Sequence, residues 1–289
     1  MLHNNITHFL HYCKTSNYSA NALDAFATRL KEFQLFTDSL PISSIPQITY
    51  IHLSQFVADF NHPSIHVKKQ RIWTLRQFFH FLKLNNIIEQ NIALKLPYPK
   101  IGKKIPKYLN MNEFKQILAF FANKANSLQG LRNLIIVMLF GFLGLRLKSV
   151  LNLNVIDIDL KSSVIWFQEK GNRKRCLPLP QLLCECLASY LNILDLKQGP
   201  LFLSKQNKRL SERALQHIFK KAMDQIHINK HLHAHLFRHT AATMLNKVAG
   251  PVITQHVLGH ARRKNTNIYT HLNPDLYAVY MKKHPYMTL

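Results

Sequence analysis

The segment PYPKIGKKIPKYL, residues 97–109, limits the possible folds of this chain more than any other feature. Pro97, Pro99 and Pro106 fix the backbone and lack amide donors, so no regular helix can continue through it. A chain of 289 residues is also longer than one hydrophobic core usually organises. We therefore expect two domains, residues 1–96 and 110–289, joined by a basic linker at 97–109.

Helical periodicity dominates residues 1–96. Ser19 is suited to cap a helix in which Leu23, Phe26 and Leu30 recur at helical spacing. Further helices are expected at about 51–60 and 65–84. The pattern predicts a bundle of helices for the first domain.

The second domain is expected to combine helices with a small sheet. Asn110 and Glu113 have capping-box spacing, and residues 131–143 are apolar on every side, which predicts a buried helix. Period-two patterns predict strands at 155–160, 163–169 and 175–179, with a turn at 170–172. Helical spacing returns at 181–194, 210–226, 234–248, 251–258 and 274–283, with Pro251 after Gly250 as a helix start. The predicted fold class is mainly α with a small inserted antiparallel β-sheet.

The charge balance indicates a polyanionic partner. Lys and Arg number 38 against 14 Asp and Glu, a formal net charge of +24. A field of this size attracts nucleic acid through counterion release, and a membrane surface or a merely basic protein are the alternatives. The most apolar run, 134–143, is well short of the roughly 18 residues that a membrane span needs. The N-terminus lacks the pattern of a signal peptide, and the four cysteines show no CxxC spacing, so a reducing cytoplasm is expected.

Basic residues crowd two places that could contact a phosphate backbone. The first is the front half of the 65–84 helix, and the second is the linker. The candidate contacts are Lys68, Lys69, Arg71, Arg76, Lys100, Lys103 and Lys104. An ordinary solvated helix face is the alternative for the first group.

The stretch HLHAHLFRH places His235, Arg238 and His239 at i, i+3 and i+4, on one side of a helix. The two histidines have the spacing of a zinc helix, so a metal site is one interpretation. No Glu lies between them, however, and Arg238 puts a permanent cation in that place. An arginine flanked by histidines in a basic chain favours phosphate binding.

Other chemically capable residues are spread along the second half. Arg146 follows a glycine break in GFLGLRLKSV, and Lys170 lies in the expected turn of EKGNRKR. Leu258-Gly259-His260 precedes Tyr269 in NIYTH. Taken singly, each has an ordinary structural explanation. The same region holds three more tyrosines that compete with Tyr269: Tyr277, Tyr280 and Tyr286.

In order and spacing, these motifs resemble the tyrosine recombinases, the phage-integrase-type site-specific recombinases, and most of all the Xer-like members. That family carries a G-L-R turn, a hairpin K-G-x-x-x-R, H-x-x-R-H, L-G-H and a Tyr nine residues on. This chain has GLR, KGNRKR, HLFRH, LGH and IYTH in that order. NYSANALDAFATRLKEF, RIWTLRQFFHFL and the linker extend the likeness over nearly the whole chain.

The resemblance implies a SAM-like core-binding helical domain followed by a tyrosine-recombinase catalytic domain. It implies the catalytic set Arg146, Lys170, His235, Arg238, His260 and Tyr269, supported by Ser149, His239 and Gly259. Tyr269 would form a 3′-phosphotyrosyl link, with no metal and no cofactor. One departure is Ser149, since the family usually has an acidic residue at that position, three after the first Arg.

The implied partners are a double-stranded DNA recombination site and further subunits. The family acts as a tetramer, so a homo-tetramer or a hetero-tetramer with a sister recombinase is expected, passing through a Holliday junction. A C-terminal helix after Tyr269 would dock into a neighbouring subunit, and the protein would be cytoplasmic and nucleoid-associated, with no membrane partner. Two alternatives remain: a catalytically silent DNA-binding protein and a type IB topoisomerase-like enzyme.

Overall fold

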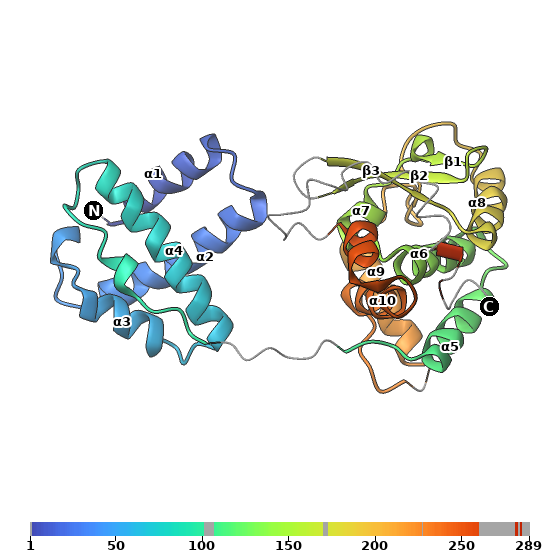
Figure 1. Cartoon of the computed structure of the whole chain (residues 1–289). Coiled ribbons are helices and arrows are strands. Elements are labelled where there is room, and N and C mark those ends of the chain that lie inside the picture. The colour runs from blue at the N-terminus through green and yellow to red at the C-terminus, as the bar shows by residue number, and fades with distance from the viewer. Residues whose placement is uncertain are drawn as a thin grey trace. The chain divides into compact units, whose positions relative to one another are not determined.

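The computed structural model describes residues 2–100, 107–169, 173–226, 228–259, 281–282 and 284. It divides the chain into two compact units, Met1–Lys104 and Ile105–Leu289 (Figure 1). Each unit has its own cluster of buried apolar side chains.

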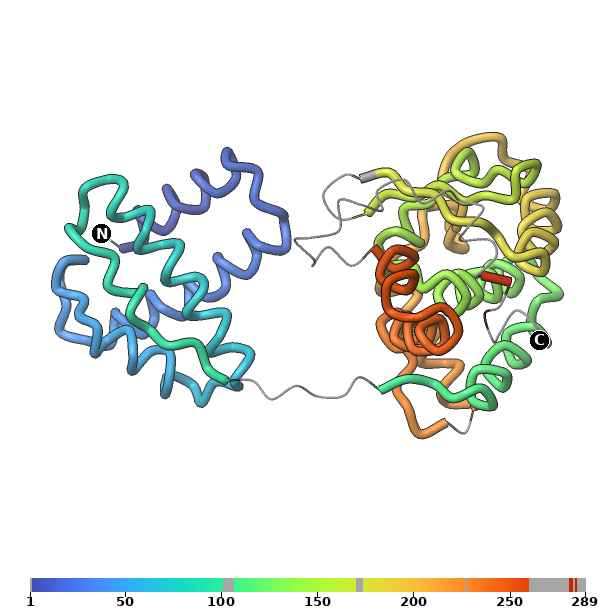
Figure 2. Tube along the Cα trace, in the orientation of Figure 1, coloured from blue at the N-terminus to red at the C-terminus, as the bar shows by residue number. Residues whose placement is uncertain are grey.

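The N-terminal unit is a bundle of helices. Ser19 accepts a hydrogen bond from the Ala22 amide at the start of the second helix, as predicted. Helix α4 packs against the helices α1, α2 and α3 of this unit (Figure 2). The elements are α1 (Leu2–Thr15), α2 (Ala20–Asp38), α3 (Tyr50–Ala58) and α4 (Ile65–Leu84), with the 3-10 turns η1 (Ile45–Gln47) and η2 (Ile92–Lys95).

Aromatic side chains fill the core of this bundle. The Phe9 ring lies 5.3 Å from that of Phe26 and 5.5 Å from that of Phe78, centroid to centroid. Phe33 and Phe56 pair in the same way at 5.1 Å. Such pairs add specific edge contacts to the burial of large apolar surfaces, so the helices are fixed against one another.

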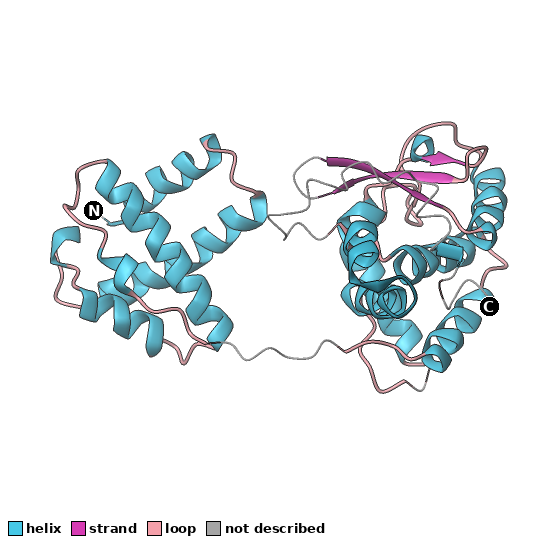
Figure 3. Ribbon diagram, in the orientation of Figure 1, coloured by secondary structure: helices cyan, strands magenta, loops and turns pink. Residues whose placement is uncertain are grey.

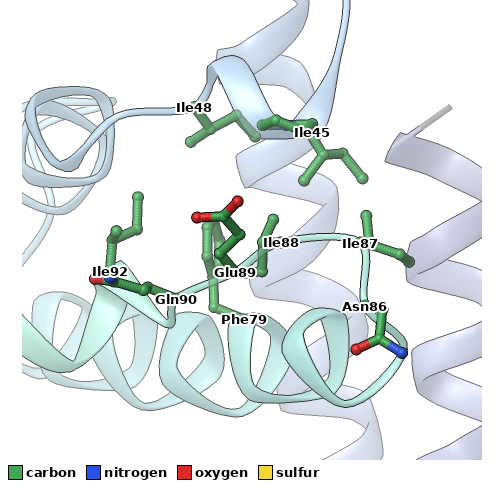
Figure 4. Close-up of a pocket in the computed structure, with 10 residues that line it drawn as sticks. Ile45, Ile48, Phe79, Asn86, Ile87, Ile88, Glu89, Gln90 and Ile92 are labelled. Atoms are coloured by element: carbon green, nitrogen blue, oxygen red, sulfur yellow. The ribbon is translucent and has the colours of Figure 1, made fainter.

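A pocket of about 560 Å³ opens in the N-terminal unit. Figure 4 shows Ile45 and Ile48 on one side of it and Ile88, Glu89 and Ile92 on the other. Its lining includes none of the residues that the sequence predicts for catalysis or DNA contact. The pocket is therefore not part of the predicted site.

The C-terminal unit is built around a buried helix, α6. The capping box at Asn110 and Glu113 opens α5 as predicted, with the Asn110 amide donating to Glu113 Oε2 at 2.7 Å. Helices α5, α8 and α10 pack against α6 (Figure 1). The helices are α5 (Met111–Ala122), α6 (Leu128–Leu143), α7 (Leu147–Leu151), α8 (Gln181–Leu194), α9 (Glu212–Met223) and α10 (Ala234–Leu258).

A three-stranded antiparallel sheet with the order β1-β2-β3 lies beside these helices (Figure 3). The strands are β1 (Ile158–Asp159), β2 (Val164–Glu169) and β3 (Arg173–Pro178). The expected strand at 155–160 is mostly wrong, because residues 155–157 form the 3-10 turn η3 (Val155–Asp157). The Asn154 amide donates to Asp157 Oδ2 at 2.7 Å, and this local bond closes the turn before the strand can begin. The predicted fold class, mainly α with a small antiparallel sheet, is confirmed.

Helix α10 contains a break that the sequence predicts. Gly250 has φ 74° and ψ 174°, which is not helical, and Pro251 restarts the helix. The helix ends at Gly259, whose φ of 62° and ψ of 45° lie in the left-handed region that glycine adopts most easily. Within the described part of the chain, no helix combines the length and the hydropathy needed to cross a membrane.

Candidate active site

Three arginines meet at the C-terminal end of helix α10. The last carbonyls of a helix lack helical partners and carry the negative end of its dipole, so they attract cations. Arg175 donates to the carbonyls of His256 and Val257, and Arg238 donates to that of Leu258. Arg146 donates from Nη2 to the carbonyl of Gly259 at 2.8 Å. Four consecutive carbonyls, 256 to 259, therefore each accept from an arginine.

These arginines come from three separate parts of the chain. Arg146 is the N-cap residue of α7, Arg175 lies within β3, and Arg238 lies in the first turns of α10. Arg238 also donates from Nη1 to the carbonyl of Gly144 at 2.5 Å, at the end of α6. It thus joins the ends of two helices, and residues far apart in sequence converge on one place.

The structure shows why the GLR turn begins with a glycine, Gly144. It ends α6 with φ 61° and ψ 29°. A Cβ atom there would lie 2.4 Å from Leu258 Cδ2 and 3.2 Å from Ala241 Cβ, so α10 packs closely on this turn. The turn directs the chain into Arg146 two residues later.

A carboxylate lies among the three cations. Glu169 Oε1 accepts from Arg146 Nη1 at 2.5 Å and from Arg175 Nη1 at 2.8 Å. The Glu169 side chain is 10% exposed, against 30% for Arg146. A Cβ atom on Gly259 would lie 2.2 Å from Arg175 Nη1 and 2.4 Å from both Glu169 oxygens. The glycine of the LGH motif therefore packs directly on this ion pair.

The cluster has an excess of positive charge. Burial and the nearby charges of Arg146 and Arg175 together lower the pKa of Arg238 to about 10, while the charge of Glu169 acts in the opposite direction. Arg238 still carries its proton at neutral pH. Three guanidinium groups against one carboxylate leave a net positive site, which suits an anionic ligand such as a phosphodiester.

The histidines of the HLFRH motif lie in the first turns of α10. The rings of His235 and His239 are 6.2 Å apart, and both side chains are exposed. The part of the His239 ring that is covered by the protein loses hydration, which lowers the pKa of His239, and the charges of His235, Arg238 and His233 act in the same direction. His239 is therefore neutral at physiological pH. Among the residues that the structure describes, no group of three or more His, Cys, Asp or Glu could hold a metal ion.

Ser149 is buried beside the cluster rather than within it. Its hydroxyl donates to the carbonyl of Gln168 at 2.8 Å, next to Glu169 in strand β2. The structure thus brings Arg146, Arg238 and Gly259 together. Ser149 contacts Gln168, the residue before Glu169 in the chain. Three predicted catalytic residues lie outside the described residues: Lys170, His260 and Tyr269.

The sequence motifs gave no role to Glu169, and none to Arg175 although Arg175 is the last residue of the KGNRKR motif. The pairing of Phe167 with Arg175 and of Ile165 with Leu177 puts these residues and Glu169 on one face of the sheet. Ile165 and Phe167 on that face are buried. The sequence did contain a signal for Glu169. This residue continues the alternation of Ile165 and Phe167, and a charged residue on the inward face of a strand requires a partner.

One predicted DNA contact, Arg71, is wrong. The side chain is 2% exposed, and its guanidinium donates to Glu32 Oε2 and to the carbonyls of Phe56 at 2.7 Å and Phe60 at 2.8 Å. Its guanidinium carbon also lies 4.4 Å from the centroid of the Phe56 ring. Arg71 holds α2, α3 and α4 together and is not available to a phosphate.

The other predicted contacts differ in availability. Arg76 donates to the carbonyls of Leu94 and Leu96, which occupies part of its guanidinium. Lys68 is half-buried, whereas Lys69 and Lys100 are exposed. Lys103 and Lys104 lie outside the described residues. Contact of these lysines with DNA stays a prediction.

Comparison with known protein families gives two matches along the chain. The phage integrase family matches residues 107–275, and the phage integrase N-terminal SAM-like domain matches residues 6–86. A tyrosine recombinase XerC of Thermodesulfovibrio yellowstonii is 30% identical over 97% of this chain and 96% of its own length. One from Alcanivorax borkumensis is 34% identical over 73% of this chain and 71% of its own.

Solved structures share the fold. The XerH site-specific recombinase bound to its difH substrate has a TM-score of 0.73 at 20% identity, covering 96% of this chain and 94% of that one. A lambda integrase tetramer bound to a Holliday junction has a TM-score of 0.73 at 16% identity, covering 91% and 78%.

Proposed function

The chain belongs to the phage integrase family, and from this premise we propose that it is a site-specific tyrosine recombinase that cleaves and rejoins DNA strands. The observation that carries the proposal is the convergence of Arg146 and Arg238 on the end of helix α10. The chain continues from that helix end towards Tyr269, ten residues after Gly259. A cationic cluster and a phenol are the components that phosphoryl transfer to tyrosine requires.

Arg146 and Arg238 act on the scissile phosphate in this proposal. A phosphodiester resists nucleophiles because it is an anion, and attack concentrates further charge on its non-bridging oxygens. Guanidinium groups donate paired, charge-assisted hydrogen bonds to such oxygens. Donors already fixed by the α6 and α10 ends require little reorganisation when that charge develops.

Tyr269 is the proposed nucleophile. Its oxygen forms a bond to phosphorus while the bond from phosphorus to the 5′ oxygen breaks. A phenol has a pKa of about 10, so His235 accepts its proton, and Lys170 donates a proton to the departing 5′ oxygen. His260 hydrogen-bonds the phosphate. The products are a 3′-phosphotyrosyl ester and a free 5′ hydroxyl.

The energy of the phosphodiester is kept in that covalent link. A 5′ hydroxyl from another strand can therefore reverse the step and seal a new junction without ATP. The residues assigned to these steps supply every proton transfer, so no metal or other cofactor is assigned a role. Strand cleavage is expected to persist in EDTA, and its abolition by the chelator would remove this mechanism.

The proposed partner is a double-stranded DNA recombination site. The XerH structure is a complex with its difH substrate, and the lambda integrase structure is a tetramer on a Holliday junction. By this likeness we propose a tetramer on DNA, either homo-oligomeric or with a sister recombinase. The basic linker at 97–109 would follow the phosphate backbone. Action on such DNA would place the protein at the nucleoid in the cytoplasm.

A nicked suicide substrate tests the function. Cleavage next to the nick releases a short fragment, so the covalent protein–DNA complex cannot be religated and accumulates. The proposal expects a DNA-linked band from the wild-type protein, which one defined sequence enhances over bulk DNA. Binding without any adduct would indicate the silent DNA-binding alternative. Adducts without site preference would indicate the topoisomerase-like one.

A further inference from the structure

Glu169 is a buried carboxylate in contact with two of the three clustered arginines. We propose that Glu169 is a positioning residue for strand cleavage. This inference rests on the proposed function. Its carboxylate holds Arg146 and Arg175 in the orientation that phosphate binding requires. It is not among the residues that the sequence motifs identify as catalytic.

The position of Glu169 in the sheet makes a structural accident a poor explanation. It follows Ile165 and Phe167 on the buried face of β2, where a further apolar residue would continue the core. Its side chain is only 10% exposed. A carboxylate with so little exposure to water needs hydrogen-bond donors or opposite charges for stability, and here one oxygen accepts from both guanidinium groups.

The contacts of Arg146 show what the carboxylate does. Nη1 donates to Glu169 and Nη2 donates to the Gly259 carbonyl. Two fixed terminal nitrogens set the plane of a guanidinium, which a single bond would leave free to rotate. The two bonds use two of the five N–H donors that an arginine carries, so the contact does not by itself exhaust its capacity for phosphate.

Arg175 extends the same connection to the hairpin. It binds the carbonyls of His256 and Val257 at the α10 end and the carboxylate at the end of β2. Through its bonds to Arg146 and Arg175, Glu169 therefore connects the sheet with the N-cap of α7 and the end of α10. It is also the residue directly before Lys170 in the chain. Holding Glu169 fixes the strand end from which the proposed general acid follows.

The residue at position 149 gives this role a reason in this chain. Ser149, three residues after Arg146, is neutral and donates to the Gln168 carbonyl. Gln168 and Glu169 are neighbours in β2. The negative charge that opposes the arginines is therefore supplied by strand β2, because the nearby residue of α7 carries no charge.

The alternative is that the carboxylate occupies the place of the scissile phosphate and must leave when DNA binds. The two roles predict opposite effects of the isosteric variant Glu169→Gln, which retains the shape and loses the charge. A positioning role lowers the cleavage rate without changing DNA affinity. A competing role raises the affinity or the rate.

The experiment measures adduct formation on the suicide substrate in single turnover at saturating DNA, with the DNA dissociation constant from gel shift. We expect Glu169→Gln to cleave about 10- to 100-fold more slowly, with the dissociation constant within about threefold of wild type. The control is Glu113→Gln, which neutralises the carboxylate paired with Lys230 at 2.6 Å while Gln can still serve the capping box. It is expected to cleave at the wild-type rate.

A Glu169→Gln rate within twofold of wild type, a faster rate, or tighter DNA binding would each overturn the inference. If that variant does not fold, Glu169→Asp is measured in its place, since it keeps the charge but shortens the reach. A slower rate with unchanged affinity then supports the role, and an unchanged rate refutes it. Failure of the wild-type protein to form any adduct would instead refute the proposed function.

Discussion

Gly259→Ala should damage both the stability and the cleavage activity of this protein, for reasons that can be separated. Gly259 ends α10 with φ 62°, and an added Cβ atom would lie 2.2 Å from Arg175 Nη1 and 2.4 Å from both Glu169 oxygens. The alanine is strained by its backbone conformation and also collides with the ion pair. The side chains of Glu169 and Arg175 would have to move away from the helix end, and Arg146 would lose its carboxylate acceptor in its present position.

The magnitude follows from these two effects. A left-handed conformation costs an alanine about 1 to 2 kcal/mol, and a lost hydrogen bond between charged groups costs about 1.5 to 3 kcal/mol. We expect the free energy of unfolding of the C-terminal unit to fall by about 2.5 to 5 kcal/mol. Displacement of Arg146 should slow adduct formation by about 100-fold, as small misplacements of a catalytic group do.

Gly199→Ala is the matched control. Gly199 also has a positive φ, 103°, but an added Cβ atom there has no neighbour within 4 Å. It should lose about 1 to 2 kcal/mol from the backbone alone and keep its cleavage rate. Denaturant unfolding measures the stability, and the suicide substrate measures the rate. If Gly259→Ala matched Gly199→Ala in both, the close packing of Gly259 on the ion pair would be refuted.

Three further outcomes are expected. Ser149→Ala should lower the free energy of unfolding by about 1 kcal/mol in denaturant titration and leave cleavage within threefold, because its hydroxyl contacts a carbonyl; a tenfold slower rate would contradict this. Arg71→Met should lower the free energy of unfolding by more than about 2 kcal/mol. Lys69→Ala should leave stability unchanged and reduce the slope of log DNA affinity against log salt concentration by about 1. The reverse pattern would contradict the internal role of Arg71. Burial lowers the pKa of His284 to about 4, so between pH 6.5 and 4 the unfolded chain binds a proton that the folded chain does not, and stability should fall as the pH falls through this window. His284→Gln should reduce that loss by at most about 3 kcal/mol in unfolding measurements at several pH values, and identical profiles would refute the assignment.

Local signals predicted much of the fold. The Ser19 cap, the capping box at Asn110 and the break at Gly250 all depend on a few adjacent residues, and all three are confirmed. The predicted strand at 155–160 is mostly wrong, because the bond between Asn154 and Asp157 competes with strand pairing and only residues 158–159 pair. Period-two hydrophobicity alone does not show that competition.

The site also contains residues that the sequence predicted and residues that it did not. The motifs predict that Arg146 and Arg238 act together, and the structure places both at the end of α10. Arg71 looked available because its partners, Glu32 on α2 and carbonyls at the end of α3, are brought to it only by the tertiary fold. The same kind of long-range packing gives Glu169 its partners. Lys170, His260 and Tyr269 stay predictions.

The identity of the covalently linked residue tests the central claim most directly. The trapped adduct is digested with protease and nuclease, and the peptide carrying the nucleotide is sequenced by mass spectrometry. The account predicts a phosphodiester on Tyr269, with no adduct from Tyr269→Phe. Attachment to Tyr277, Tyr280 or Tyr286, or an adduct that survives in Tyr269→Phe, would contradict it.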